Sequence, residues 1–355
     1  MTVYKNAVIN GVVTDFGVEN GKFAFVGKSE ADGIDLGGRE VIPGLIDIHS
    51  HGCVGYDVMD GNQHLDRMSR FYLQNGVTAW YPTTMSMAKQ VIESVTAQLP
   101  HTSGAQALGY HLEGPFINVD YKGAQEQSAI EQANLSDLKN YHHLGLMTIA
   151  PEIEGGLAAI ETAQIPVCLG HTAADYDLAV LAFEKGAVCL THTFNAMKPL
   201  HHRNPGPVGA ALTKNAYVQV ICDGFHLHPA AVMMLYKAFG ADRMILISDS
   251  MRATGLPDGE YDLGGQTTYV NNGTARLADG TLAGSTATLL TCVKRAMEFG
   301  IPKADAIRMA TATPAAMMGL QKGKLAAGYD ADFVVMDETF TPTHACVEGT
   351  FQSLL

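Results

Sequence analysis

The chain has 355 residues, of which 47% are hydrophobic and 17% are charged, and its formal net charge is −13. This length suits one barrel-sized domain plus a smaller one, and the apolar fraction excludes global disorder. The negative charge argues against a general nucleic-acid binder and against binding to anionic membrane surfaces. A small anionic substrate remains compatible with it, because a metal and a few local cations can set the potential inside one pocket.

Cysteine usage and hydropathy bear on the compartment. No apolar run approaches the roughly 20 residues that span a bilayer, and residues 1–11 lack the apolar core of a signal peptide. The six cysteines are scattered and include no CxxC pair. We therefore expect reduced, mostly buried thiols in a cytoplasmic protein.

The two chain ends have the composition of a small β domain. Asn-Gly pairs, the strongest short hairpin signal, separate the apolar runs near the N-terminus. The strand-like runs at the two ends cover residues 3–9, 23–26, 330–336 and 343–347. We predict a small β-sandwich domain that is formed from both termini, residues 1–42 and 321–355.

The middle of the chain alternates between apolar runs and helix-length segments. The apolar runs cover residues 41–48, 78–81, 107–112, 146–149, 166–170, 188–191, 218–222 and 244–248. The helical segments include residues 65–75, 175–185 and 229–239, and helical periodicity continues at 286–299 and 303–318. Eight strands that alternate with helices predict an α/β fold, a (β/α)8 TIM-type barrel, over residues 43–320.

Polar residues with useful chemistry follow these runs, where such a barrel places its functional side chains. His49 and His51 are one residue apart, so an extended segment points both to the same side. Taken singly, each candidate could be a turn residue, a helix cap or a hydrogen-bonded histidine. Taken together they predict one central cavity, lined by His49, His51, Glu113, His171, His192, Asp223, His226 and Asp249.

Imidazole and carboxylate ligands suit Zn²⁺ or Fe²⁺, and a catalytic site leaves one position open for water. A divalent metal lowers the pKa of that water from 15.7 to about 7. Asp249 ends the last strand and stands apart from the histidines, so it is the candidate to take the proton and return it to a leaving group. Such a site hydrolyses amides or related C–N bonds.

The motifs also carry a resemblance that covers nearly the whole chain. In order they are PGLIDIHSHG, LEGPF, GHT, THTFNAM, DGFH, SDSM, LAGS and GKLAAGYDADFVVMD. This set resembles the N-acetylglucosamine-6-phosphate deacetylase family of the amidohydrolase superfamily. The HxH pair alone indicates only the superfamily, whereas LEGP together with THTFNAM is much narrower.

The resemblance implies a metal held by Glu113, His171 and His192, with Asp249 as general base and then acid. Some members lack one or both histidines of the first motif and bind a single ion. This chain has both His49 and His51, so a second ion, with Glu113 bridging, stays open beside the single-ion alternative.

The resemblance also implies a substrate-binding set. Asn195 and Ala196 match positions that meet the sugar phosphate. Arg203 matches a phosphate-binding arginine that comes from the neighbouring subunit of a homodimer. Gln125 stands where other members have a histidine that polarises the substrate carbonyl, and its amide can donate a hydrogen bond but carries no charge. The complete set is Ala124, Gln125, Asn195, Ala196, Arg203, His226, Leu282, Ala283 and Gly284, the last three in a loop that closes over the substrate.

The expected activity is hydrolysis of N-acetyl-D-glucosamine 6-phosphate to D-glucosamine 6-phosphate and acetate in amino-sugar catabolism. Three alternatives stay open. The substrate could be the galactosamine epimer or another N-acyl amino sugar, or the enzyme could be a nucleobase deaminase or cyclic amidase, which LEGP and THTFNAM disfavour. A non-catalytic scaffold is the third, and the complete ligand set argues against it.

Overall fold

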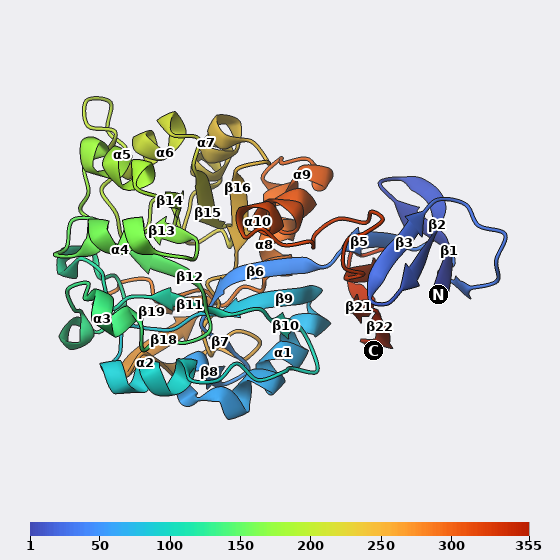
Figure 1. Cartoon of the computed structure of the whole chain (residues 1–355), viewed down its shortest axis with the longest axis horizontal. Helices are drawn as coiled ribbons and strands as arrows, with labels where there is room; N and C mark the ends of the chain where they lie inside the picture. Colours follow the sequence, from blue (N-terminus) through green and yellow to red (C-terminus); the bar gives the residue numbers. More distant parts are fainter. Residues whose placement is uncertain (355) are drawn as a thin grey trace.

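The computed structural model describes residues 1–354 and has an α/β fold built around a curled parallel sheet (Figure 1). Each of the eight predicted apolar runs overlaps one strand of this sheet. The strands are β6 (Leu45–Ser50), β9 (Val77–Pro82), β11 (Tyr110–Glu113), β12 (Leu144–Ile149), β13 (Val167–Leu169), β14 (Ala187–Leu190), β15 (Tyr217–Ile221) and β16 (Met244–Ile247).

Pairing of neighbours in chain order curls the sheet back on itself. Strands β11 to β16 pair consecutively, and β6 pairs with β9, which also pairs with the short strand β10 (Gln106–Ala107). Parallel bridges join Thr83 to His111 and Ser50 to Ser250 across the two remaining gaps. The carboxyl ends of all eight strands therefore open toward the same side.

Helices cover the outside of this sheet (Figure 1). They are α1 (Leu65–Gln74), α2 (Lys89–Thr96), α3 (Leu135–Leu138), α4 (Gly156–Thr162), α5 (Tyr176–Glu184), α6 (Gly206–Thr213), α7 (Pro229–Phe239), α8 (Leu289–Glu298), α9 (Lys303–Met309) and α10 (Ala312–Met317). Four short 3₁₀ segments are η1 (Val58–Asp60), η2 (Asn62–His64), η3 (Val119–Tyr121) and η4 (Gln127–Ala129).

The helical periodicity at residues 303–318 corresponds to two helices and not one, because α9 ends at Met309 and α10 begins at Ala312. Between them Thr311 leaves the helical region, with φ at −137°. Pro314 explains the break, since proline has no N–H for the carbonyl of residue 310 and its ring clashes with that carbonyl in a continuous helix.

The apolar core has two parts. The larger cluster lies between strands and helices, and its helical members recur at three- and four-residue spacing, as Leu65, Met68 and Tyr72 do on α1. The smaller cluster comes almost wholly from alternate strand residues such as Ile245 and Ile247, so it fills the inside of the curled sheet. Polar residues replace it mainly toward the carboxyl ends of the strands, and Gln219 in the middle of β15 is an exception.

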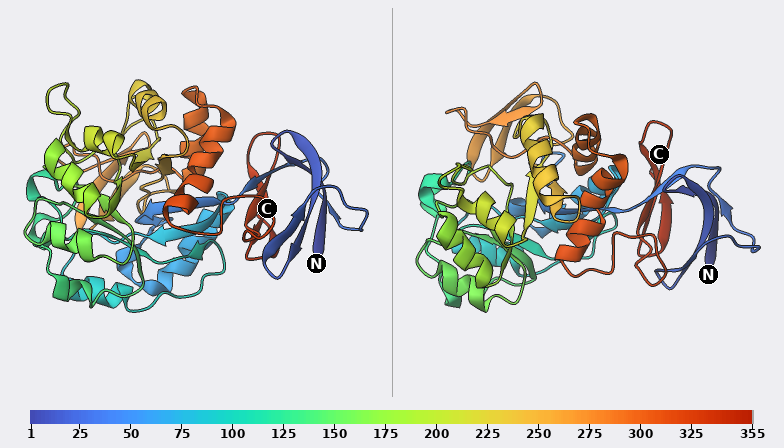
Figure 2. Two further views of the ribbon diagram at one scale, coloured as in Figure 1. Left: turned by 45° about the horizontal axis from the view of Figure 1, so that its top comes forward. Right: turned by 90° about the horizontal axis from the view of Figure 1, so that it is seen from above.

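Strands from both chain ends form a separate eight-stranded sheet beside the curled one (Figure 2). Asn10 and Gly11 have φ of 49° and 77°, as the tight turn between the first two strands requires. The strands are β1 (Thr2–Ile9), β2 (Val12–Glu19), β3 (Lys22–Val26), β4 (Ile34–Asp35), β5 (Glu40–Pro43), β20 (Phe333–Met336), β21 (Pro342–Val347) and β22 (Thr350–Ser353).

The apolar run at 41–48 is not one strand, as the sequence suggested, but two. Strand β5 pairs with β20 in the terminal sheet, whereas β6 begins the curled sheet. Gly44 stands at the junction, and a Cβ atom there would overlap the Thr78 side chain on β9. Glycine thus lets the chain pass close to its neighbour as it leaves one sheet for the other.

Two small antiparallel elements were not predicted. One is the hairpin β7 (Gly52–Cys53) and β8 (Tyr56–Asp57). The other is the three-stranded sheet β17 (Gly259–Leu263), β18 (Gln266–Asn271) and β19 (Thr274–Arg276), which packs Leu263 and Val270 against Met85 and Met251. Its Gln266 side chain donates to the Ala124 carbonyl at 2.6 Å, so this sheet contacts the loop that follows β11.

Within residues 1–354, none of the helices combines the length and the apolar character that crossing a lipid bilayer requires.

Candidate metal centre and active site

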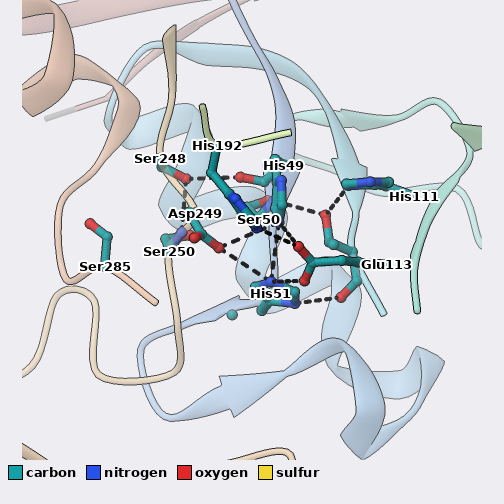
Figure 3. Close-up of polar contacts among 12 residues, drawn as sticks. His49, Ser50, His51, His111, Glu113, His192, Ser248, Asp249, Ser250 and Ser285 are labelled. Carbon is teal, nitrogen blue, oxygen red and sulfur yellow. Dashed lines mark hydrogen bonds and ion pairs between the residues drawn. The ribbon is translucent and has the colours of Figure 1, made fainter. Parts of the chain in front are cut away.

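Six of the predicted side chains converge at the carboxyl ends of the curled strands. In Figure 3, Glu113 and Asp249 approach the histidine nitrogens from opposite sides. Each of the six is at most 7% exposed, so water has little access to their polar atoms. They are His49, His51, Glu113, His171, His192 and Asp249.

Glu113 belongs to two groups of possible metal ligands. Its Oε1 lies 3.2 Å from His171 Nε2 and 3.0 Å from His192 Nε2, which makes the first group. The second group comprises His49, His51 and the same carboxylate, with Glu113 Oε2 3.2 Å from His51 Nε2. A single ion in the first group and a bridged pair of ions are both compatible with this arrangement.

The spacing of the donor atoms fits a coordination shell. The Nε2 atoms of His171 and His192 are 3.1 Å apart, and those of His49 and His51 are 3.3 Å apart. Ligand atoms placed tetrahedrally at 2.0–2.1 Å from a zinc ion are about 3.3–3.4 Å from one another. Imidazole nitrogens directed at one point beside a carboxylate are therefore arranged as a divalent cation needs them.

Hydrogen bonds on the far side of the rings direct three of these histidines. Nδ1 of His171 lies 2.9 Å from the Tyr121 carbonyl, and Nδ1 of His51 lies 3.2 Å from the Thr83 carbonyl. Nδ1 of His49 lies 3.2 Å from the Gln219 side-chain oxygen. Because these oxygens only accept, they favour a proton on Nδ1 and leave the Nε2 lone pair facing the centre.

Both carboxyl groups of the site are held in the ionised form. Burial alone would raise the pKa of Glu113, but electrostatic attraction to His49 and the close contacts with His171 and His192 hold it well below its usual range. Burial likewise opposes ionisation of Asp249, and His49 and His51 outweigh it and lower the pKa. Two buried anions among imidazoles favour a cation in the same space.

Three of the site residues have left-handed backbone, which non-glycine residues rarely adopt. The φ angles of His171, His192 and Asp249 are 49°, 24° and 48°. Surrounding contacts hold these turns: the Asp249 N–H donates to the His49 carbonyl at 2.9 Å, and the Ser285 N–H donates to the Asp249 carbonyl at 2.7 Å. The sharp turns aim the side chains inward as each strand ends.

Gln125 is buried beside the ligands in a fixed orientation. Its Oε1 accepts from the Ser86 N–H at 2.7 Å, so its amide nitrogen faces Glu113 and donates to Oε2 at 2.8 Å. One N–H of the amide is thus used by the carboxylate, and the other is available to the pocket. The expected carbonyl-polarising position is occupied, but by a group that is tied to a metal ligand.

His226 lies in the same pocket and bonds to a carboxylate. Its Nδ1 is 2.7 Å from Asp223 Oδ2, and Asp223 Oδ1 accepts the N–H groups of Phe225 and His226. Burial by itself lowers the pKa of His226, but the bond to Asp223 and its charge raise it overall. The imidazolium form is favoured at a position that faces the pocket.

The structure brings most of the predicted substrate-binding residues to one pocket. Ala283 instead lies in the buried apolar cluster with Met85 and Met251, and Arg203 is exposed, with its guanidinium donating to His202 Nε2 at 2.8 Å. His49 does not line this pocket; besides His51, Glu113, His171, His192 and Asp249, the lining comprises Met85, Gly123, Ala124, Gln125, Asn195, Ala196, Ile221, His226, Leu263, Thr281, Leu282 and Gly284.

Sequence reasoning missed two buried polar residues next to the ligands. His111 packs its ring edge-on against His49 at 4.5 Å, and its Nε2 lies 2.8 Å from Thr148 Oγ1. Burial first of all lowers the pKa of His111 far below its usual value, which favours the neutral form. Gln219 contacts His49 from β15. Each is a polar residue within an otherwise apolar run, and that irregularity was the available signal.

Comparison with known proteins agrees with this geometry. Residues 41–353 match the model of the amidohydrolase family. The chain belongs to this family. It is 38% identical to an N-acetylglucosamine-6-phosphate deacetylase of Vibrio furnissii over 93% of this chain and 88% of that protein. It is 37% identical to an N-acetylgalactosamine-6-phosphate deacetylase of Escherichia coli O157:H7 over 88% of this chain and 87% of the relative.

Solved structures give the same result. The N-acetylglucosamine-6-phosphate deacetylase of Thermotoga maritima superposes with a TM-score of 0.90 at 31% identity, over 99% of both chains. A second structure is that of the Mycobacterium smegmatis N-acetyl-D-glucosamine-6-phosphate deacetylase, in which one aspartate is replaced by alanine and N-acetyl-D-glucosamine-6-phosphate is bound. It superposes with a TM-score of 0.91 at 30% identity, over 99% of this chain and 98% of the other.

Replacing Glu113 by alanine should remove the carboxylate that both ligand groups share. We expect the affinity for Zn²⁺ to fall by more than about 100-fold, beyond the loss typical of residues outside the coordination shell. Metal content after dialysis, measured by elemental analysis, checks this. Glu154→Ala, at an exposed glutamate, is the matched control and should keep the metal. A fully metallated Glu113→Ala protein would contradict the assignment.

Proposed function

We propose that this chain is a metal-dependent hydrolase that converts N-acetyl-D-glucosamine 6-phosphate to D-glucosamine 6-phosphate and acetate. The observation that carries the proposal is the cluster of inward-facing imidazoles around Glu113, with Asp249 on its open side. The names of relatives that align over most of the chain support the substrate class. The ligand set also argues against a non-catalytic scaffold.

We propose Zn²⁺ or Fe²⁺ as the cofactor, because imidazole and carboxylate donors suit both ions. Glu113, His171 and His192 would hold one ion, and His49 and His51 would hold a second with Glu113 between them. When bound, the cation would supply Lewis acidity that lowers the pKa of water and polarises the acetyl carbonyl.

Asp249 is proposed as the general base and then the general acid. Its Oδ1 lies 3.4 Å from His49 Nε2 and 3.2 Å from His51 Nε2, at the edge of the ligand cluster and in the pocket. Because its lowered pKa keeps it ionised, it can accept a proton from the attacking water. The same carboxyl group can then protonate the departing amine.

Two groups are placed to stabilise charge on the substrate. The remaining N–H of Gln125 and the imidazolium of His226 both reach the pocket, and both are pre-oriented by fixed partners. Donors that are already aligned cost little reorganisation when negative charge develops on the carbonyl oxygen. We assign Asn195, Ala196, Leu282 and Gly284 to the sugar phosphate and its covering loop, as the family resemblance implies.

We further propose that the curled sheet and its helices are a (β/α)8 barrel over residues 43–320. Residues 1–42 and 321–355 would form the small domain, of which the structure describes residues up to 354. The sandwich character of that domain stays a prediction. A cytoplasmic site of action also stays a prediction, which six unpaired cysteines suit.

Among the residues described, the substrate phosphate has no lysine or arginine partner within the pocket. Arg203 is exposed on the loop after β14, where another chain can meet it. We propose a homodimer in which Arg203 binds the substrate phosphate in the neighbouring subunit.

The galactosamine epimer is the second candidate substrate, because a relative named for it is nearly as similar as one named for the glucosamine form. Acetate release from both phosphosugars, at measured metal content, tests the function. We expect turnover of the glucosamine substrate with the higher kcat/KM. A preference for the galactosamine form would select the alternative, and metallated protein that releases no acetate from either sugar would reject deacetylation.

The change Asp249→Asn keeps the shape of the side chain but removes the proton acceptor. We expect kcat for acetate release to fall by roughly 10²–10⁴-fold, the usual contribution of a positioned acid or base. Metal content measured on the same sample should stay close to that of the unmodified protein. Near-normal kcat in this variant would refute the assigned role.

The change Arg203→Ala should raise KM for the phosphosugar about 10- to 100-fold, the loss expected for a hydrogen bond to a charged group. Mixed dimers test whether the arginine acts across the interface. If it does, pairing Arg203→Ala chains with Asp249→Asn chains restores one site with both groups. Activity that never exceeds the sum of the two parents would place Arg203 in its own subunit's site or outside the mechanism.

A further inference from the structure

We propose that Gln219 is a positioning residue that keeps His49 in the metal-binding tautomer. Through His49 it would control the His49–His51 ligand group separately from the group formed by His171 and His192. This inference rests on the proposed function in its two-ion form, in which His49 and His51 hold one of the ions. Gln219 touches neither the pocket nor any of the other ligands, so its action would pass through one ring.

Gln219 lies on β15 inside the curled sheet and is completely buried. Its Oε1 is 3.2 Å from His49 Nδ1, and its Nε2 is 3.5 Å from the sulfur of Cys168. Its own carbonyl accepts the Thr193 N–H at 2.8 Å, which fixes the backbone at this position. The side-chain amide therefore has one polar partner at each end and no route to bulk water.

The direction of this amide decides which nitrogen of His49 carries the proton. With oxygen toward the ring, Nδ1 must donate, and the Nε2 lone pair points at Glu113 and His51. With the amide reversed, its N–H would donate to Nδ1 and the proton would move to Nε2. A protonated Nε2 cannot bind metal, so the observed direction is the productive one.

His49 depends on Gln219 more than the other ligands depend on their partners. His51 and His171 bond to main-chain carbonyls, which no side-chain substitution removes. The Nδ1 atom of His192 has no partner within residues 1–354. Among these Nδ1 partners, only that of His49 is a side chain. A substitution at Gln219 can therefore change the tautomer of His49, whereas no substitution removes the main-chain partners of His51 and His171.

The chemical consequence follows from burial. If the acceptor is removed, the Nδ1–H of His49 is left without a hydrogen-bond partner in a dry interior, which is unfavourable. Moving the proton to Nε2 relieves this cost, because Nε2 lies near Glu113 Oε1, at 3.3 Å. The histidine would then donate to the carboxylate instead of offering a lone pair to an ion.

Two substitutions separate the acceptor from mere packing. Gln219→Met fills similar volume without an acceptor, whereas Gln219→Glu keeps an acceptor that, when ionised, cannot be reversed. We expect two Zn²⁺ binding events, and the methionine variant should weaken the one at His49 and His51 by about 10- to 100-fold. This is the usual effect of removing the hydrogen-bond acceptor of a metal-binding histidine. The other event should be unchanged, and the glutamate variant should restore both. Titration calorimetry on metal-free protein measures these affinities.

The tautomer itself can be read without metal or activity. ¹⁵N-histidine spectra of the metal-free protein, with His49 assigned by comparison with a His49→Asn variant, should show the proton on Nδ1 in the unmodified chain. Gln219→Met should shift it toward Nε2, and Gln219→Glu should not. Cys168→Ala removes the contact at the far end of the amide and is the matched control, with an unchanged His49 signal expected.

Circular dichroism and the unfolding midpoint establish that each variant is folded before it is compared. A folded Gln219→Met protein with unchanged affinity in both binding events and an unchanged His49 proton would overturn the inference. Failure of the proposed function appears differently, as unmodified protein that binds no ion and releases no acetate. The ¹⁵N spectra would still decide whether Gln219 sets the tautomer in that case.

Discussion

The site depends on one buried carboxylate among four imidazoles. Glu113 stands within 3.3 Å of a nitrogen of His49, His51, His171 and His192. A negative charge in a dry interior is unfavourable by itself, and so is a group of histidine nitrogens whose lone pairs face one another. The carboxylate and the histidine nitrogens compensate one another, and a cation that both can bind would complete the compensation. The left-handed turns at His171, His192 and Asp249 are tolerated for the same reason.

The curled sheet supplies the geometry that makes this compensation possible. The ligands are far apart in sequence, yet each follows or ends a strand, and parallel strands deliver their carboxyl ends to the same place. Bridges at Thr83–His111 and Ser50–Ser250 close the two gaps in the sheet right beside the ligands. The strand ends, together with the short turns that directly follow them, therefore set the distances between the donor atoms.

Much of this arrangement follows from sequence, and what did not follow has physical causes. Apolar runs located all eight strands, and the polar residues that follow six of those runs gave the candidate site residues. The break at Gly44 was missed because a close approach to Thr78 is a tertiary contact, which a local pattern does not contain. Gln219 and His111 were missed because their hydrogen bonds join distant strands. The direction of the Gln125 amide depends on Ser86, which no motif connects to it.

The pairing of β5 with β20 has a consequence for biosynthesis. Strand β5 leaves the ribosome long before its partner β20 is made. The exposed edge of β5 must wait while about 290 intervening residues are synthesised, and closing so long a loop is slow. A nascent chain of this protein therefore carries an open strand edge until β20 has been synthesised, which makes that edge a natural target for chaperones.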